Sequence, residues 1–209
     1  MKIGIIGAGN VGSTLARRLV ETGHAVKVSA SSPDSPRLAD VTFVGAAVAP
    51  TAEAAEWADV VLLAVPFTAL DATLTDDVVS ALDGKVVIDA TNPLAPDFMS
   101  LTIGHTTSAA EQVAVRLPRS RVVKAFNTVL AATMGTPELG GTRLLLPVAG
   151  DDAAAKSIVV DLGIQLGFDA VDAGALLNAR YLEPAAELLL QFAFGQSMGA
   201  GVGFALARG

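Results

Sequence analysis

Short apolar runs alternate along the chain with segments in which apolar residues recur every three or four positions. The clearest of these segments is Val11–Glu21, where Val11, Leu15 and Leu19 fall on one helical face. Continuous apolar runs such as VVLLAV at 60–65 are typical of strands that are buried on both faces. The pattern therefore predicts an alternation of strands and helices.

The expected strands are Lys2–Ile6, Ala25–Ser29, Val41–Val44, Val60–Val65, Lys85–Ala90, Arg121–Phe126, Thr142–Ala149 and Asp169–Val171. The expected helices are Val11–Glu21, Thr51–Trp57, Phe67–Leu82, residues 109–116, a segment from about Thr128, Ala153–Leu166 and Ala179–Phe194. Ser108 and Glu111 have the spacing of a capping box before the helix at 109–116. This order predicts an α/β fold, with a mainly parallel sheet and helices on both faces.

The chain has 209 residues, the size of one domain or of one domain with a small appendage. Fourteen Lys and Arg against 21 Asp and Glu give a net charge of −7, and no basic run occurs. We therefore expect no nucleic-acid partner, because such proteins need cations against the phosphates. The lack of Cys and the presence of only two His argue against thiol chemistry and against a metal site.

A membrane location needs testing because the mean hydropathy is +0.54. The 20 charge-free residues Leu188–Ala207 are long enough to span a bilayer. However, they include Gln191, Gln196, Ser197 and four glycines, which favour a packed helix followed by a loop. The N-terminal run continues into the first predicted element and is not typical of a signal peptide. We expect a cytoplasmic protein without a membrane segment.

The sharpest functional signal is the sequence GAGNVG at 7–12, which follows a predicted strand and opens an amphipathic helix. In a dinucleotide site, Gly7 permits a tight turn, Gly9 admits a pyrophosphate and Gly12 allows close helix packing. The alternative interpretation is a purely structural turn. The candidate cofactor-binding residues here are Gly7, Ala8, Gly9, Asn10, Val11 and Gly12.

The end of the second strand predicts NADP as the cofactor. NAD sites place a carboxylate there, whereas this chain has Ser31 and Ser32 and no acid before Asp34. Small hydroxyls can donate to a 2′-phosphate, and Arg37 is a further candidate cation, although it is not at the usual position for one. The simpler interpretation of the two serines is a polar turn.

The remaining site residues should follow the other strand ends, because ligands of open parallel sheets lie there. The candidates are Val65, Pro66, Phe67, Thr91, Asn92, Pro93, Phe126, Asn127 and Thr128. Asn92 and Asn127 are the best candidates for binding a carboxamide or ribose, whereas Thr91 and Thr128 could equally cap helices.

Few ionisable residues are available for catalysis. His105, in the polar loop at 94–107, and Asn127 are candidates for catalysis. Lys124 and Asp89 lie inside strands, where Lys124 is expected to pair with a carboxylate and Asp89 to be structural or catalytic. Hydride transfer between two bound redox cofactors fits this scarcity better than hydrolysis, because it needs mainly stacking and exclusion of water.

Several motifs resemble the NADPH-dependent reductases of the deazaflavin coenzyme F420. The specific ones are TNPL at 91–94, KAFNT at 124–128, GDD at 150–152 and DAGALLNAR at 172–180. KAFNT also resembles the cytosolic domain of STEAP-type metalloreductases. Two features depart from the family pattern: Ser32-Pro33 stands where well-studied members carry arginines, and Asn127 stands where they often have histidine.

The resemblance implies a Rossmann-type, doubly wound domain over residues 1–149 and a small C-terminal α/β lobe over 150–209, in a homodimer. NADPH would lie along residues 7–12, Ser31, Pro66 and Asn92. A deazaflavin or flavin acceptor would stack near Asn127–Val129, with the segment Gln196–Gly203 closing the site.

Two other functions are compatible with these residues. One is a small-substrate reductase of the imine or hydroxyacid type, which usually adds a helical domain of about a hundred residues. The other is an NADP-binding regulator without catalysis, because cofactor binding and turnover use the same glycines.

Overall fold

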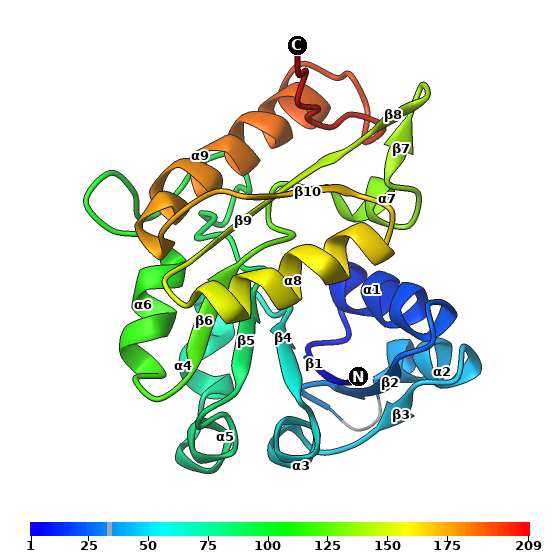
Figure 1. Cartoon of the computed structure of the whole chain (residues 1–209), viewed down its shortest axis with the longest axis vertical. Helices are drawn as coiled ribbons and strands as arrows, with labels where there is room; N and C mark the ends of the chain where they lie inside the picture. The colour runs from blue at the N-terminus through cyan, green and yellow to red at the C-terminus, as the bar shows by residue number, and fades with distance from the viewer. Residues whose placement is uncertain (33–34) are drawn as a thin grey trace.

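In the computed structural model, which describes residues 1–32 and 35–209, an eight-stranded sheet runs through the molecule (Figure 1). Its strand order is β10-β9-β6-β5-β4-β1-β2-β3. The pairs from β3 to β6 are parallel, β9 is antiparallel to β6, and β10 is parallel to β9. This is the doubly wound order of a Rossmann-type fold, in which β2 and β3 are added on one side of β1 and β4, β5 and β6 on the other, so the predicted fold class is confirmed.

The sheet strands are β1 Lys2–Ile6, β2 Ala25–Ser29, β3 Ala47–Val48, β4 Val60–Leu63, β5 Val86–Asp89, β6 Arg121–Lys124, β9 Leu145–Gly150 and β10 Asp169–Asp172, and a separate hairpin pairs β7 Glu138–Leu139 with β8 Thr142–Arg143. The helices are α1 Asn10–Glu21, α2 Pro36–Phe43, α3 Thr51–Trp57, α4 Leu70–Thr73, α5 Asp76–Ala81, α6 Ala109–Arg116, α7 Ala131–Met134, α8 Ala153–Gln165 and α9 Ala179–Leu190. Short helical turns are η1 Phe67–Ala69, η2 Leu176–Asn178 and η3 Gln191–Gly195.

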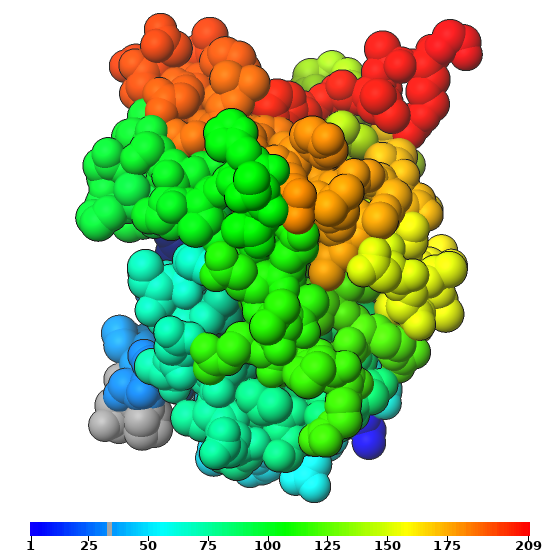
Figure 2. All heavy atoms as spheres, turned by 90° about the vertical axis from the view of Figure 1, so that its left-hand side faces the viewer, coloured from blue at the N-terminus to red at the C-terminus, as the bar shows by residue number. Residues whose placement is uncertain are grey.

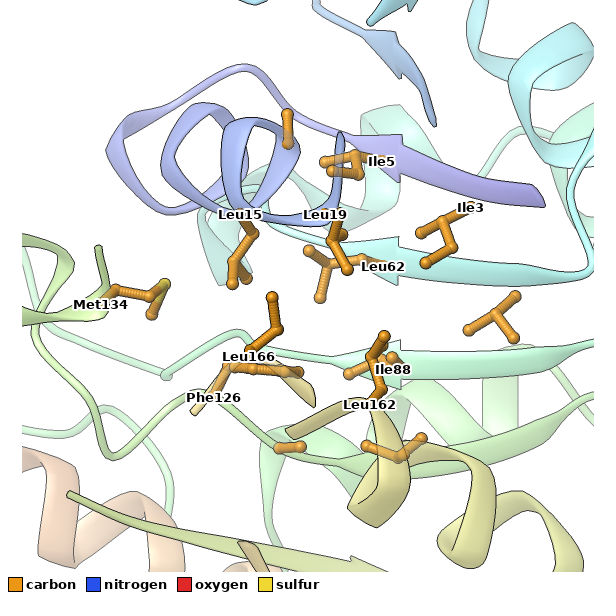
Figure 3. Packing of buried hydrophobic residues seen from close by; sticks show 14 of the residues in the cluster. Ile3, Ile5, Leu15, Leu19, Leu62, Ile88, Phe126, Met134, Leu162 and Leu166 are labelled. Atoms are coloured by element: carbon orange, nitrogen blue, oxygen red, sulfur yellow. The ribbon is translucent and has the colours of Figure 1, made fainter. Parts of the chain in front are cut away.

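Apolar side chains of the sheet are buried on both faces. On one face, Ile3 and Ile5 of β1 pack against Leu15 and Leu19 of α1, and Leu162 of α8 joins the same cluster (Figure 3). On the other face, a second cluster combines the sheet with α3 to α6. The two layers hold the strands rigidly, so that the loops at the carboxyl ends have fixed positions.

One predicted strand is wrong. Val41–Val44 was expected to be extended, but Val41 lies in α2 and the next strand is Ala47–Val48. Pro36 at the first helical position and the spacing of buried Leu38 and Val41 favour the helix. A four-residue apolar run cannot distinguish a strand from a helix, whereas Gly45, with φ 94°, ends the helix in the usual way.

The single helix predicted over Phe67–Leu82 is divided into η1, α4 and α5. The second break lies at Thr75, which has an extended backbone as the N-cap of α5, and its hydroxyl donates to the Asp77 carboxylate at 2.5 Å. The helix expected from about Thr128 begins instead at Ala131 and has four residues.

The C-terminal part continues the same sheet. The predicted domain boundary between residues 149 and 150 falls inside β9, and both β9 and β10 belong to the eight-stranded sheet. The division into two domains stays a prediction. Within Leu188–Ala207 the helical structure ends at Gly195. Among the described residues, no helix has the length and apolar character needed to cross a membrane.

Candidate functional site

The turn after β1 requires glycine at two positions. Gly7 has φ 112°, and a Cβ there would lie 2.5 Å from the carbonyl oxygen of Ala64. A Cβ at Gly12 would lie 1.8 Å from the carbonyl oxygen of Gly7. The start of α1 therefore packs directly onto the turn, and only glycine permits this approach.

Gly9 is different, because the protein's own packing does not require a glycine there. A Cβ at Gly9 would meet nothing closer than 3.9 Å. Gly9 is also the N-cap residue of α1, and no side chain caps the helix. The first N–H groups of α1 thus remain available to an anion, and the space over Gly9 lets a phosphate approach them. These residues fit a dinucleotide diphosphate.

A cleft of about 770 Å³ opens beside this turn, at the carboxyl ends of β1, β2 and β4. Predicted residues that line it are Gly7, Ala8, Gly9, Ser31, Arg37, Val65 and Pro66. Phe67 instead lines a neighbouring groove of about 600 Å³ between α4 and α6. Figure 2 shows a hollow between the green loop before α6 and the cyan segment around α4, with atoms of the N-terminal segment at its base.

Arg37 supplies a cation to this cleft. Its Nη1 donates to Asn10 Oδ1 at 2.9 Å, and the same atom lies 3.9 Å from the position of a Cβ on Gly9. The guanidinium therefore lies over the glycine turn, as α2 starts directly after the loop from β2. Ser31 lines the same cleft. Pro33 and Asp34 lie outside the described residues, so the expectation for that position is untested.

Asn92 and Asn127 form an amide pair at the carboxyl ends of β5 and β6. Asn92 Nδ2 donates to the backbone carbonyl of Asn127, and Asn127 Nδ2 donates to Asn92 Oδ1, both at 3.1 Å. Asn127 Nδ2 also donates to the carbonyl of Leu182 in α9 at 3.1 Å. Because backbone carbonyls only accept, these bonds fix the orientation of both amides.

Three buried oxygen atoms near this pair have no hydrogen-bond partner within the described part of the chain. They are Asn127 Oδ1, Thr91 Oγ1 and Thr128 Oγ1. All three residues are at least nine-tenths buried. A buried polar atom without a partner costs about 1–3 kcal/mol, so these atoms suit a ligand that brings donors, such as a carboxamide or a ribose.

Phe126 turns the chain sharply between β6 and Asn127. Its φ is 65°, which is rare for a residue with a large side chain. The ring packs edge-on against Phe168 with centroids 6.0 Å apart, and it belongs to the hydrophobic core (Figure 3). Only the backbone of Phe126 can thus face a ligand. Sequence reasoning missed this turn, because no glycine marks it.

Lys124 was predicted to pair with a carboxylate, and the structure shows it paired with two, those of Asp89 and Glu183. Its Nζ lies 2.9 Å from Asp89 Oδ2 and 2.8 Å from Glu183 Oε1, and it donates to the carbonyl of Thr91 at 2.5 Å. All three side chains are buried, and we call them the lysine cluster. Asp89 has a structural partner here. The role of Glu183 was missed, because nothing in the sequence of α9 indicates a buried acid.

Two further expectations can now be placed. His105 is exposed in the loop before α6 and has φ 61°, and its role in catalysis stays a prediction. The segment Gln196–Gly203 packs at Gly203, where a Cβ would come within 2.5 Å of Leu144, and Phe204 then accepts from the backbone N–H of Leu145. Closure of the site by this segment also stays a prediction. In the described ranges, no three metal-binding side chains gather.

Comparisons with known proteins agree with this geometry. The model of the protein family described as "NADP oxidoreductase coenzyme F420-dependent" matches residues 2–93 of this chain. The F420-dependent NADP reductase of Methanothermobacter marburgensis is 33% identical over 209 residues, which cover 91% of each chain. The metalloreductase STEAP3 of Rattus norvegicus is 33% identical over 190 residues, which cover 87% of this chain. The chain spans only about a third of that metalloreductase, 36% of its length.

A solved structure extends the similarity to the whole chain. A protein of Arthrobacter sp. FB24, named as a candidate F420-dependent NADP reductase, superposes with a TM-score of 0.91. Its sequence identity is 31%, and each chain is covered completely. The similarity therefore includes β9, β10 and α9 as well as the glycine turn.

Proposed function

Since this chain belongs to the family of F420-dependent NADP oxidoreductases and is an NAD(P)-dependent oxidoreductase, we propose that it moves a hydride between NADP(H) and a deazaflavin or flavin acceptor. The observation that carries the proposal is Gly9, where the open space and the uncapped start of α1 suit a pyrophosphate. Bound NADPH supplies the hydride, and the protein binds it, orients it and excludes water.

The proposed residues of the NADP site fall into two groups. The glycine turn takes the diphosphate, and Ser31 and Arg37 face the 2′-phosphate from the same cleft. The amide pair and the unpaired hydroxyls of Thr91 and Thr128 bind the carboxamide and ribose of the nicotinamide half. A guanidinium favours the phosphate of NADP over the plain ribose of NAD, and we expect tighter binding of NADPH than of NADH.

The acceptor is proposed from the chemistry near the amide pair. The Lys124 ammonium is buried in the lysine cluster, between Asp89, Glu183 and the Thr91 carbonyl, so it does not face a substrate. Ring-to-ring hydride transfer does not require an acid or base at this point. The printed names of the relatives support coenzyme F420 as the acceptor.

The test is hydride exchange by the purified protein. NADPH is mixed with coenzyme F420, FMN, FAD or a ferric chelate, and both absorbances are followed with time. Bleaching of the deazaflavin or of a flavin is the expected result. If no acceptor is reduced, the proposed reaction is wrong, and a thermal shift with NADP but without turnover would then favour a regulator.

The proposal also includes a homodimer in the cytoplasm. Exposed apolar side chains extend over α9 and its flanking residues: Leu177, Tyr181, Leu188, Phe192 and Met198. Such a patch is typical of a surface that is covered in an assembly. Light scattering of the purified protein should give twice the mass of one chain, and the mass of a single chain would exclude the dimer.

A further inference from the structure

Three ionisable residues of the lysine cluster are buried beside the amide pair. Lys124 and Asp89 are 0% exposed and Glu183 is 1% exposed. They come from β6, β5 and α9, so the cluster joins the sheet to the C-terminal helix. Breaking a buried ion pair is costly, because it leaves an uncompensated charge away from water.

The lysine ammonium is enclosed by polar groups of the protein. Its Nζ donates to Asp89 Oδ2 at 2.9 Å and to the carbonyl of Thr91 at 2.5 Å, and it forms an ion pair with Glu183 Oε1 at 2.8 Å. Because Lys124 is also 0% exposed, it neither donates a proton to a substrate nor binds its charge directly. Whatever it contributes to the reaction must act through the groups that it holds.

The two carboxylates are also satisfied. Asp89 Oδ1 accepts from the backbone N–H of Thr91 at 3.0 Å. Glu183 accepts from the backbone N–H groups of Ala109 at 2.9 Å and Ala110 at 3.2 Å, at the start of α6. The positive end of α6 thus compensates the second negative charge, so the cluster is complete without a ligand.

The groups held by the cluster adjoin those that hold the amide pair. Thr91, whose carbonyl and N–H are both bound, directly precedes Asn92. Glu183 directly follows Leu182, whose carbonyl accepts from Asn127. A movement of α9 at Glu183 would shift that carbonyl, and Asn127 would then lose the bond that orients its amide.

We propose that Lys124 is a positioning residue for hydride transfer. With Asp89 and Glu183 it fixes the Thr91 backbone and the Leu182 carbonyl, so that Asn127 Oδ1 faces the ligand without a protein partner. The cluster thereby couples the position of α9 to the orientation of the nicotinamide. This inference rests on the proposed function, because it assigns the ligand of Asn127 to NADP(H).

The first experiment uses Glu183→Gln, which keeps the side-chain volume and leaves the Lys124–Asp89 pair in place. In either orientation of the new amide, its NH2 group faces a donor, which is the Ala109 N–H or the Ala110 N–H with the Lys124 ammonium. Because two donors repel each other, we expect α9 to shift. The NADPH dissociation constant should stay within about threefold of wild type. Hydride transfer per NADPH-binding site should fall by about tenfold or more, because a small misplacement of reacting groups is costly.

Counting active sites by NADPH titration separates positioning from folding. A purely structural role would reduce the number of sites and leave the rate per site unchanged, which would overturn the proposal. The matched control is Lys156→Met, because Lys156 also bridges a carboxylate and a carbonyl, those of Asp172 and Gly174. Its rate per site should equal that of wild type.

A double-variant cycle identifies the route of the effect. If the cluster acts through Asn127, Glu183→Gln combined with Asn127→Ala should transfer hydride at the rate of Asn127→Ala alone, within about twofold. If the double variant instead loses rate by the product of the two single losses, the cluster does not act through Asn127. Lys124→Met removes the ammonium directly and should show the same loss of rate per site. If Lys124→Met does not fold, the result for Glu183→Gln decides whether the cluster positions Asn127.

A ligand-free measurement keeps the inference separate from the proposed function. In ¹⁵N-labelled protein, Glu183→Gln should shift the side-chain amide signals of Asn92 and Asn127, and Lys156→Met should leave them in place. Unchanged amide signals would overturn the positioning role. Failure of wild type to bind NADPH or to reduce an acceptor would overturn only the proposed function.

Discussion

The two halves of the candidate site are held by contacts of different range. In the phosphate half, which we define as residues 7–12 with Arg37, the ligand-facing groups follow from the turn itself and from a bond between Arg37 and Asn10, 27 positions apart. In the amide half, Asn92 and Asn127 are 35 positions apart, and Asn127 and Leu182 are 55 apart. Glu183 reaches Ala109 over 74 positions.

This difference predicts how each half responds to substitution. The phosphate half is mostly backbone, so a side chain added there acts directly on the ligand. The amide half is mostly side chains in a buried network, where a change at one residue is passed to its partners. Substitutions in the first half should therefore affect affinity, and those in the second should affect the rate of hydride transfer.

The largest effect is expected for Gly9→Asp. The new carboxylate would stand where the pyrophosphate approaches α1, and the affinity for NADPH should fall by at least about a hundredfold. Stability should not fall, because Asp is a favourable N-cap and the protein leaves room for it. Nucleotide fluorescence measures the affinity, and thermal unfolding measures the stability.

Gly9→Ala is the matched control for the added charge. Its methyl group meets nothing closer than 3.9 Å in the protein, so it should reduce affinity by a smaller factor, about tenfold, at unchanged stability. Unchanged NADPH affinity in Gly9→Asp would disprove the phosphate half as the cofactor site.

The second effect is on the rate. Asn127→Ala removes the unpaired Oδ1 and the bond to Leu182, and hydride transfer should fall by about tenfold to a hundredfold, corresponding to about 1–3 kcal/mol. NADPH affinity should change only a few-fold. Stopped-flow absorbance gives both values. Asn178→Ala, which removes a similar amide bond to the carbonyl of Ala173, is the control and should leave the rate unchanged.

The third effect concerns cofactor choice. Arg37→Gln removes the guanidinium beside Gly9, and NADPH affinity should fall by about tenfold, whereas NADH affinity should stay nearly constant. Arg17→Gln removes the same charge from an exposed position on α1 and serves as the control. Equal losses for both nucleotides would show that Arg37 binds the shared diphosphate and does not select NADP.

The same contrast in range explains what could be predicted from the sequence. The glycine turn, the alternation of strands and helices and the capping box of Ser108 and Glu111 depend on local spacing, and the structure contains all three. Asn92 and Asn127 were found because polar residues directly follow buried strands. Their mutual pairing was not foreseen, since it depends on the neighbouring positions of β5 and β6.

The missed features arise from contacts that no local pattern records. Glu183 is an ordinary acid in the sequence of α9 and becomes a buried partner of Lys124 only in the folded chain. Phe126 adopts a left-handed conformation, and its ring packs against Phe168, which lies 42 positions further along the chain. The error at Val41–Val44 is of another kind, because the helical signals at Pro36 and Gly45 were present and the short apolar run was given more weight.

The smallest effect is expected for Glu111→Gln, which loosens the amide half without entering it. Glu111 receives two hydrogen bonds from Arg180 at 2.9 and 2.7 Å, joining α6 to the start of α9. Arg180, and then the Ser108 hydroxyl, hold the pKa of Glu111 below its ordinary value despite partial burial. The two side chains are 23% and 28% exposed, so solvent screening limits the expected loss of unfolding free energy to about 1 kcal/mol.

The pH dependence tests this assignment. Because the pKa of Glu111 is lowered by folding, its pair with Arg180 stabilises the protein fully above the ordinary carboxyl pKa, and the stabilisation is lost as pH falls through the lowered value. Urea unfolding should give a larger free energy of unfolding for wild type than for Glu111→Gln at neutral pH. This difference in free energy should shrink as the solution is made acidic. Glu53→Gln is the control and should show a smaller difference, because the Glu53 side chain, paired with Lys27 outside both halves of the site, is 58% exposed. A gap between wild type and Glu111→Gln that stays constant down to acidic pH would show that packing at α6, and not the charge pair, joins the two helices.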